Sequence, residues 1–205
     1  MAEEEKNEIK EPEKKQEKES WQKSIMTYLH DLTHMLAVIM IVFLLLFRVV
    51  VVSGSSMYST LWDGDWVLVT GNLLYNEPEY GDIIVASKDS FNDGEAIIKR
   101  VIATEGQTVD IDFNAGIVYV DGVALEEDYT YTPTNYEEGM VFPLVVEEGC
   151  VFAMGDNRND SKDSRHPSIG MIDCREILGK AVFILFPGTD HGYADRNFDR
   201  IGALK

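Results

Sequence analysis

The longest apolar stretch of the chain runs from Leu32 to Val52 and is interrupted only by Thr33, His34 and Arg48. Its central part, Leu36–Phe47, has no polar face. About 20 apolar residues in a helix cross a bilayer, whereas a surface helix of a soluble domain keeps one polar side. The pattern therefore predicts one membrane-spanning helix within residues 25–52. A buried core helix and a cleaved signal peptide are the alternatives, and the long charged tail before the span disfavours the second.

From residue 53 onward the pattern changes to short β-branched and aromatic runs bounded by Gly, Asn, Asp or Pro. These runs lie at residues 66–70, 82–87, 96–103, 107–112, 117–120, 142–146, 150–154 and 177–186. Asp121-Gly122, between Ile117–Val120 and Val123–Leu125, is a strong signal for a two-residue hairpin. No long amphipathic helix is apparent. We expect a mainly β fold, a compact antiparallel β domain over residues 53–205 that follows the single N-terminal helix.

Residues 1–24 are mostly polar and hold six Lys against eight Glu. Such a segment has little to bury, and we expect a disordered tail. The whole chain has 36 acidic and 18 basic side chains, a net charge of −18, which argues against nucleic acid as a partner. The Lys-rich short side of a span usually stays in the cytoplasm. We therefore expect residues 53–205 outside the plasma membrane.

The chain has two cysteines, Cys150 and Cys174. An outward-facing domain permits a disulfide, but two buried free thiols are the preferred interpretation. Neither cysteine belongs to a CxxC pair, and no histidine cluster accompanies them. The sequence predicts no metal site and no cofactor.

The stretch Ser53–Leu61 follows the apolar run directly and is rich in hydroxyl groups. If the span ends at Val52, Ser56 lies within about 14 Å of it, because an extended residue covers at most about 3.6 Å. A serine nucleophile needs a base. His166 stands in an Arg-His-Pro loop that no strand positions, and His191 lies in a polar segment that we expect at the surface.

Lys99 is the better candidate for this base. It lies in the predicted strand Ala96–Ala103, where Ile97 and Val101 share its face because side chains alternate. Apolar surroundings disfavour the charged amine and lower its pKa. A neutral lysine can accept a proton from a serine hydroxyl. A lysine that extends from the sheet edge into water is the alternative, and this strand alone does not decide between them.

The third polar stretch is Gly155–Arg165. Its acidic residues suggest a calcium loop, but an EF-hand counted from Asp156 needs glycine and glutamate where Ser161 and Pro167 stand. A tight loop held by its own Asx and Asp–Arg hydrogen bonds is the structural alternative.

Four stretches together resemble the ordered sequence boxes of bacterial type I signal peptidases, the leader peptidase family. They are Ser53–Leu61 after a span, Gly81–Val85, Ile98–Arg100 and Gly155–Arg165. The resemblance runs from the span to about Phe186, and the single span with a short outer domain is similar to the Gram-positive form. Each box alone is a weak signal, whereas four in order are specific.

The resemblance implies a Ser–Lys dyad with Ser56 as nucleophile, Lys99 as general base and Ser161 as the hydroxyl that orients the lysine amine. Asp163 and Arg165 match the pair that holds the loop of the site. The Ser56 N–H matches an oxyanion donor, and Gly54 stands where some members have an assisting serine. The expected supporting residues are Gly54, Met57, Arg100, Gly155, Asp156, Asn157, Arg158, Asp163 and Arg165.

The implied activity is removal of signal peptides by a membrane-anchored serine endopeptidase. The implied partners are preproteins with signal peptides, the lipid bilayer and the secretion machinery. Gly81–Ser87 could pair with the substrate as an added strand, and family members accept small residues at the first and third positions before the cut. Two alternatives stay open: a dedicated or self-processing Ser–Lys protease of the same fold, and a non-catalytic anchored domain that binds peptides.

Overall fold

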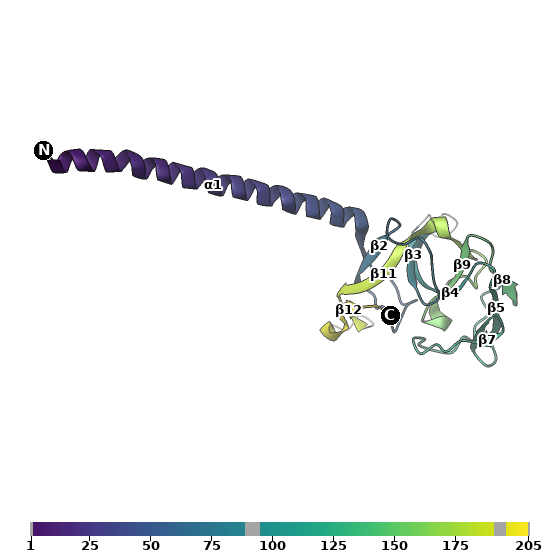
Figure 1. Cartoon of the computed structure of the whole chain (residues 1–205). Coiled ribbons are helices and arrows are strands. Elements are labelled where there is room, and N and C mark those ends of the chain that lie inside the picture. Colours follow the sequence, from purple (N-terminus) through teal and green to yellow (C-terminus); the bar gives the residue numbers. More distant parts are fainter. Residues whose placement is uncertain (1, 89–94, 191–195, 205) are drawn as a thin grey trace. The chain divides into compact units, whose positions relative to one another are not determined.

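The computed structural model describes residues 2–88, 95–190 and 196–204, and it divides into a helical unit and a β unit (Figure 1). The helical unit is one helix, α1 (Ala2–Leu46). Its part Trp21–Leu46 has 26 residues and is long and apolar enough to cross a membrane. The predicted N-terminal apolar helix is therefore confirmed.

The predicted end of this helix at Val52 is wrong. The helix ends at Leu46, and Phe47–Val51 form strand β1, which pairs with β2 (Trp66–Gly71). A continuous apolar run does not distinguish helix from strand, and the valines before Ser53 favour a strand because they are β-branched. Ser56 is ten residue steps from the helix end at Leu46, so the upper limit on its distance from that end rises from about 14 Å to about 33–36 Å.

The expectation of a disordered tail also differs from the structure, because residues 2–24 belong to α1. The composition explains the difference. Glu, Lys and Gln are among the better helix formers, since straight side chains lose little rotamer freedom in a helix. Low apolar content argues against a packed core but does not by itself argue against a helix.

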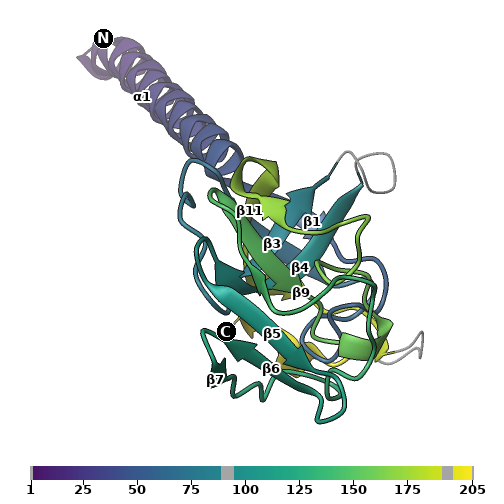
Figure 2. The same ribbon diagram turned by 90° about the vertical axis from the view of Figure 1, so that its right-hand side faces the viewer.

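The β unit contains two antiparallel sheets, which lie as separate layers in Figure 2. The larger sheet has the order β1-β2-β11-β3-β4-β9-β10, with β12 paired to β11. Its further strands are β3 (Ile83–Ser87), β4 (Ala96–Thr104), β9 (Cys150–Met154), β10 (Ile172–Asp173), β11 (Ile177–Phe186) and β12 (Gly202–Ala203). The smaller sheet comprises β7 (Val123–Ala124), β6 (Ile117–Val120), β5 (Thr108–Asp112) and β8 (Leu144–Val145), in that order.

Each of the eight predicted β runs contains a strand, so the mainly β fold is confirmed. The predicted hairpin joins β6 to β7, and its turn residues Asp121 and Gly122 have φ of 52° and 78°. Two positive φ angles are what a tight type I′ turn requires. Strands β10 and β12 were not predicted, because two-residue strands carry no periodicity. Short 3₁₀ helices within the described residues include η2 (Arg158–Asp160), η3 (Cys174–Glu176) and η5 (Phe198–Arg200).

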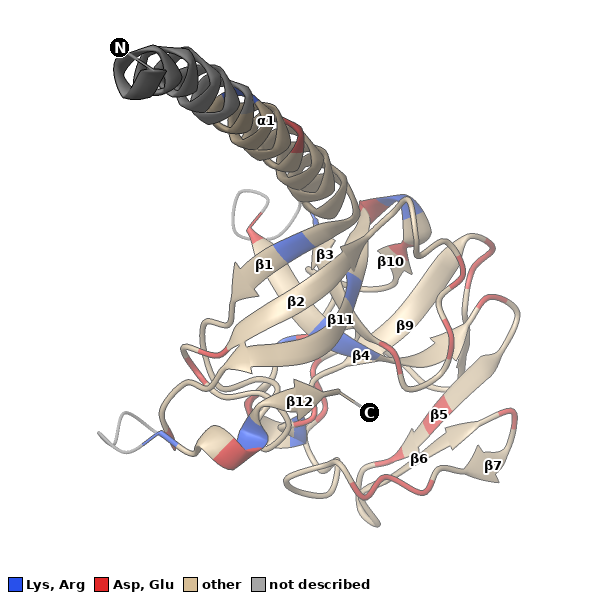
Figure 3. Ribbon diagram, turned by 60° about the vertical axis from the view of Figure 1, so that its left-hand side comes forward, with Lys and Arg blue, Asp and Glu red and all other residues tan. Residues whose placement is uncertain are grey.

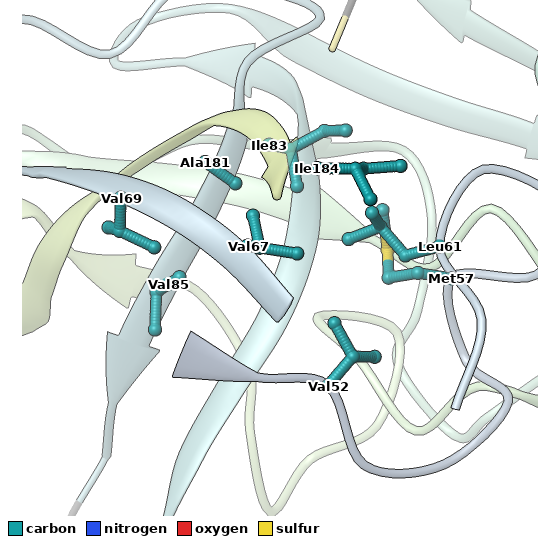
Figure 4. Packing of buried hydrophobic residues seen from close by; sticks show 9 residues of the cluster. All are labelled: Val52, Met57, Leu61, Val67, Val69, Ile83, Val85, Ala181 and Ile184. Atoms are coloured by element: carbon teal, nitrogen blue, oxygen red, sulfur yellow. The ribbon is translucent and has the colours of Figure 1, made fainter. Parts of the chain in front are cut away.

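The core of the larger sheet anchors the segment that carries Ser56. Val52, Met57 and Leu61 point toward one another and toward the sheet in Figure 4. Their partners in the cluster are Val67, Val69, Ile83, Val85, Ala181 and Ile184. Apolar side chains on both sides of Ser56 are thus buried, which fixes the ends of an otherwise polar loop.

Charge is distributed unevenly over the β unit. In Figure 3, acidic positions recur on β5 and in the loops around β6 and β7, without basic ones among them. The sequence agrees, because it has no Lys or Arg between Arg100 and Arg158. Cys150 and Cys174 are free thiols, as preferred from the sequence, although both are half-buried rather than buried.

Candidate active site

The Ser56 loop is closed at its base by backbone hydrogen bonds. The Val52 N–H donates to the Asp65 carbonyl oxygen at 2.8 Å, and the Gly64 N–H donates to the Val52 carbonyl oxygen at 2.8 Å. The Gly54 N–H donates to Asp63 Oδ1 at 2.8 Å. Ser56 is half-buried at the far end of this loop. Among the described residues its N–H has no hydrogen-bond partner, so this donor is available to a ligand.

Lys99 lies on β4 beside Ser56. Its Nζ is 2.8 Å from Ser56 Oγ, and its side chain is only 4% exposed. Burial lowers the pKa of this amine to about 8, with Asp163 opposing the shift and Arg165 adding to it. The structure therefore brings the two expected residues into hydrogen-bond contact and places the lysine in the surroundings expected for a neutral base.

A groove of about 340 Å³ opens beside this pair. It is lined by Val50, Val51, Val52, Ser53, Ser56, Met57, Glu95, Ala96, Ile97, Ile98, Lys99 and Lys162. Two strand edges contribute to it. Within the described residues, β1 pairs only with β2, and Ala96–Lys99 pairs only with β3. Backbone groups on both edges are thus available to an extended peptide.

The expected substrate-pairing strand at Gly81–Ser87 is wrong. Strand β3 lies between β11 and β4 and pairs with both of them. Both of its edges are occupied, so it cannot accept a further strand. Sequence patterns could not predict this, because strand order within a sheet depends on contacts between distant parts of the chain.

Ser161 is buried, and its hydroxyl donates to Asp163 Oδ2 at 2.9 Å. Among the described residues it makes no hydrogen bond to Lys99, the partner expected from the family. Its oxygen keeps lone pairs free, because the hydroxyl proton is directed at Asp163. The structure therefore shows an oriented Ser161 without showing the predicted contact.

Asp163 and Arg165 form the predicted pair. Arg165 donates from Nε to Asp163 Oδ1 and from Nη2 to Oδ2, each at 2.8 Å. The Gly155 N–H donates to Asp163 Oδ2 at 3.0 Å. Burial alone would raise the pKa of Asp163, but these hydrogen bonds and the Arg165 charge hold it below its usual value. The carboxylate is thereby kept ionised inside the protein.

Gly155 lies where the two polar loops meet. A Cβ at this position would collide with Ser161 Oγ and with the Ser56 carbonyl oxygen. The Asn157 N–H donates to that same carbonyl oxygen at 3.0 Å. Glycine is therefore required here by the close approach of the loops and not by a turn.

Arg100 and Asp156 form a second buried pair. Arg100 Nε and Nη2 donate to Asp156 Oδ1 and Oδ2 at 2.9 and 2.8 Å. Thr60 Oγ1 donates to Asp156 Oδ2 at 2.5 Å, and Arg100 Nη1 donates to the Gly81 carbonyl oxygen at 2.8 Å. The pair thus joins the Ser56 segment, β4 and the approach to β3.

The structure does not bring His166 into the site. His166 Nδ1 contacts Ser168 Oγ at 2.8 Å, and no hydrogen bond links it to Ser56. His191, expected at the surface, lies outside the described residues. Met57 is buried in the core, as a supporting role requires. The remaining expected residues, Gly54 and Arg158, lie on the Ser56 loop and on η2.

Sequence reasoning missed Asp160, whose Oδ2 accepts from Ser55 Oγ at 2.6 Å, and Glu127, whose carboxylate pairs with Arg158. A buried arginine implies an acidic partner. Twelve Asp and Glu residues lie between Arg100 and Arg158, however, and their spacing selects none of them.

Comparisons with known proteins identify the family of the chain. Residues 25–186 match a family model described as signal peptidase, peptidase S26. A probable signal peptidase I-1 from Synechocystis is 40% identical over 69% of this chain and 72% of its own length. Signal peptidase I from Bacillus amyloliquefaciens is 35% identical over 71% of this chain and 77% of its own.

A crystal structure of a signal peptidase I from Enterococcus faecalis is 30% identical, with a TM-score of 0.41, and covers 51% of this chain and 96% of its own. The family model alone spans more than three quarters of the chain, including the segments that carry Ser56, Lys99 and Ser161. The chain therefore belongs to the signal peptidase family, peptidase S26.

Proposed function

We propose that this peptidase removes signal peptides from exported preproteins, with Ser56 as nucleophile and Lys99 as general base. The observation that carries the proposal is the 2.8 Å contact between Lys99 Nζ and Ser56 Oγ at a lysine that is almost fully buried. A surface lysine has almost no neutral form at neutral pH, whereas a pKa lowered to about 8 leaves about a tenth of the Lys99 amine neutral at pH 7.

The reaction follows from this geometry. The neutral Lys99 amine takes the proton of the Ser56 hydroxyl while Oγ forms a bond to the carbonyl carbon of the scissile peptide. The Ser56 N–H stabilises the negative charge on the carbonyl oxygen. The Lys99 ammonium then protonates the departing amine. A water molecule, deprotonated by Lys99 in turn, hydrolyses the acyl-enzyme and frees Ser56.

The Ser161 hydroxyl and the Asp163 carboxylate orient the Lys99 amine in this proposal. Asp163 accepts a hydrogen bond from the Ser161 hydroxyl, so the Ser161 oxygen can itself accept a hydrogen bond from the amine when Lys99 turns toward it. Gly155 permits this approach because it leaves room for Ser161 next to the Ser56 backbone. Ser161 is therefore the residue that orients Lys99 in the proposal, and the Ser161→Ala variant tests the contact between the two side chains.

The substrate is an extended segment that lies between β1 and the Ala96–Lys99 edge of β4. Main-chain hydrogen bonds to free strand edges give affinity without sequence preference. Valine and isoleucine side chains line the groove, which suits the small apolar residues that the family accepts before the cut. Preproteins emerging from a bilayer supply such segments, and α1 would hold the enzyme in the same membrane.

The test is cleavage of a labelled preprotein by the full chain in detergent, compared with Ser56→Ala and Lys99→Arg. We expect loss of cleavage in both variants, because one lacks the nucleophile and the other cannot deprotonate. Several unrelated preproteins then separate a general enzyme from a dedicated one. Cleavage by folded Ser56→Ala would overturn the proposal, and a shortened wild-type chain would indicate self-processing.

A further inference from the structure

The segment Leu125–Tyr136, which we call the strap, connects the smaller sheet to the loop that carries Ser161. Tyr131 N–H donates to the Asp156 carbonyl oxygen at 3.1 Å, and Asn135 N–H donates to Asn159 Oδ1 at 3.1 Å. Asn159 Nδ2 in turn donates to Thr132 Oγ1 and to the Pro133 carbonyl oxygen. Main-chain and side-chain groups of the strap thus bind the active-site loop at several points.

The strongest link is between Glu127 and Arg158. Arg158 Nη1 donates to Glu127 Oε2 at 2.7 Å, and Nη2 donates to Oε1 at 2.5 Å. The two side chains are 10% and 1% exposed. Burial would lower the pKa of Arg158, but Glu127 outweighs it and raises that pKa. A buried guanidinium depends strongly on such a partner, because its own charge is otherwise uncompensated.

Arg158, held by Glu127, forms hydrogen bonds with two residues of the active-site loop. Its Nε donates to the Gly155 carbonyl oxygen at 3.1 Å, and its own carbonyl oxygen accepts from Arg165 Nη2 at 2.6 Å. Gly155 is in turn wedged against Ser161 and the Ser56 carbonyl oxygen. A shift of the Arg158 side chain would therefore move the peptide unit that spaces Ser161 from Ser56.

Tyr129 links Glu127 to the second buried arginine pair, Arg100–Asp156. Its hydroxyl donates to Glu127 Oε1 at 2.9 Å, and its ring lies 4.1 Å from Arg100 Cζ, which stacks over it. Arg100 is the residue that holds Asp156. Glu127 thus fixes one arginine directly and the aromatic partner of the other.

We propose that Glu127 is a positioning residue for the cleavage reaction, acting through Arg158 and Gly155 on the relative placement of Ser56 and Ser161. Among the described residues Glu127 makes no hydrogen bond to Ser56 or Lys99, and it takes no part in proton transfer. The inference rests on the proposed function, in which these residues perform the chemistry. The sequence has no Lys or Arg between Arg100 and Arg158, so the strap contains no basic residue. Glu127 therefore pairs with an arginine from another segment.

The test compares Glu127→Gln with wild-type full chain in detergent, using one preprotein and turnover per folded molecule at least 20 °C below the melting temperature. Glutamine keeps the shape but not the charge. We expect kcat to fall about 10- to 100-fold, the scale of a 1 Å misplacement, with KM changed by less than about threefold. A purely stabilising residue would lower the melting temperature and leave kcat per folded molecule unchanged, which would overturn the proposal.

Asp173→Asn is the matched control, because the half-buried Asp173 also pairs with an arginine, the exposed Arg175, through both carboxylate oxygens, on β10 away from the site. We expect its kcat to stay at the wild-type value. If Glu127→Gln does not fold, Glu127→Asp keeps the charge and withdraws the carboxylate, and we expect a severalfold loss of kcat. Wild-type kcat in Glu127→Asp would then overturn the inference.

The two hypotheses fail in different ways. Cleavage by Ser56→Ala would reject the proposed chemistry whatever Glu127→Gln does. Inactive Ser56→Ala and Lys99→Arg together with wild-type kcat in Glu127→Gln would keep the chemistry and reject the role of Glu127.

Discussion

The proposed role of Lys99 as a base near neutral pH depends on the burial of its amine. Burial lowers its pKa to about 8, and in the proposed mechanism the neutral form is the active one. We therefore expect kcat/KM to rise about tenfold per pH unit on the acidic side and to level off above about pH 8. Initial rates on one preprotein between pH 5.5 and 10 would measure this limb.

Variants at two positions would show which residue causes the acidic limb of the kcat/KM profile. Lys99→Arg should fold and remain inactive at every accessible pH, because a guanidinium does not deprotonate in this range. His166→Ala should keep both the activity and the limb, since His166 is engaged with Ser168. An inactive His166→Ala together with an active Lys99→Arg would make the histidine the base.

Ser161 tests whether the oriented hydroxyl matters. Ser161→Ala removes the side-chain hydroxyl that Asp163 holds, and with it the proposed acceptor for the Lys99 amine. We expect kcat to fall tens- to thousands-fold while circular dichroism stays unchanged, the range for loss of a positioned catalytic contact. Ser59→Ala, at an exposed position on the Ser56 segment, is the control. Full activity in Ser161→Ala would mean that the loop carrying Ser161 has only a structural role.

Motif spacing predicted the residues of the site better than their contacts. Ser56 and Lys99 were expected together and lie 2.8 Å apart. The partner of Ser161 was expected to be Lys99, but the structure shows Asp163, because a hydroxyl buried beside a carboxylate donates its proton there. Glu127 was not predicted at all, since no local pattern links residues 31 positions apart.

At the scale of elements, Gly155 joins the two polar loops, and Gly155→Ala should show how tightly they meet. The added methyl group collides with Ser161 Oγ and with a backbone carbonyl oxygen, which cannot rotate away. We expect at least a hundredfold loss of kcat/KM and a lower melting temperature, measured by preprotein cleavage and thermal unfolding. Gly202→Ala, on β12 with no atom within 4 Å of its Cβ and no positive φ, should change the activity and the melting temperature little. Wild-type kcat/KM in Gly155→Ala would mean that the loops can separate without cost to catalysis.

Alternating patterns predicted strands well because each has one buried face, as in β5 with its buried Val109 and Ile111. The pattern failed at β1, where a run of valines continues the apolar sequence of the helix without a break. It also could not order the strands, so β3 was assigned an open edge that belongs to β1 and β4. Local periodicity reports burial, whereas sheet order depends on contacts distant in sequence.

At the scale of the whole molecule, an apolar helix joins a polar N-terminal segment to a strongly acidic β domain. Residues 1–24 hold all six lysines that precede the span, whereas residues 53–205 have 27 acidic against 11 basic side chains. Lysine-rich short segments are retained in the cytoplasm, and the proposed substrate is cleaved outside it. We therefore expect the β domain on the outer surface of the plasma membrane and the N-terminal segment inside.

Labelling of single introduced cysteines would test this orientation. In a chain with Cys150→Ala and Cys174→Ala, a cysteine is placed at Ser20 or at Val141, whose side chain is 83% exposed. A membrane-impermeant maleimide added to intact protoplasts should label Val141→Cys, and it should label Ser20→Cys only after the membrane is permeabilised. The opposite pattern would place Ser56 and Lys99 in the cytoplasm, where a preprotein has not yet crossed the membrane, and would contradict the proposed role.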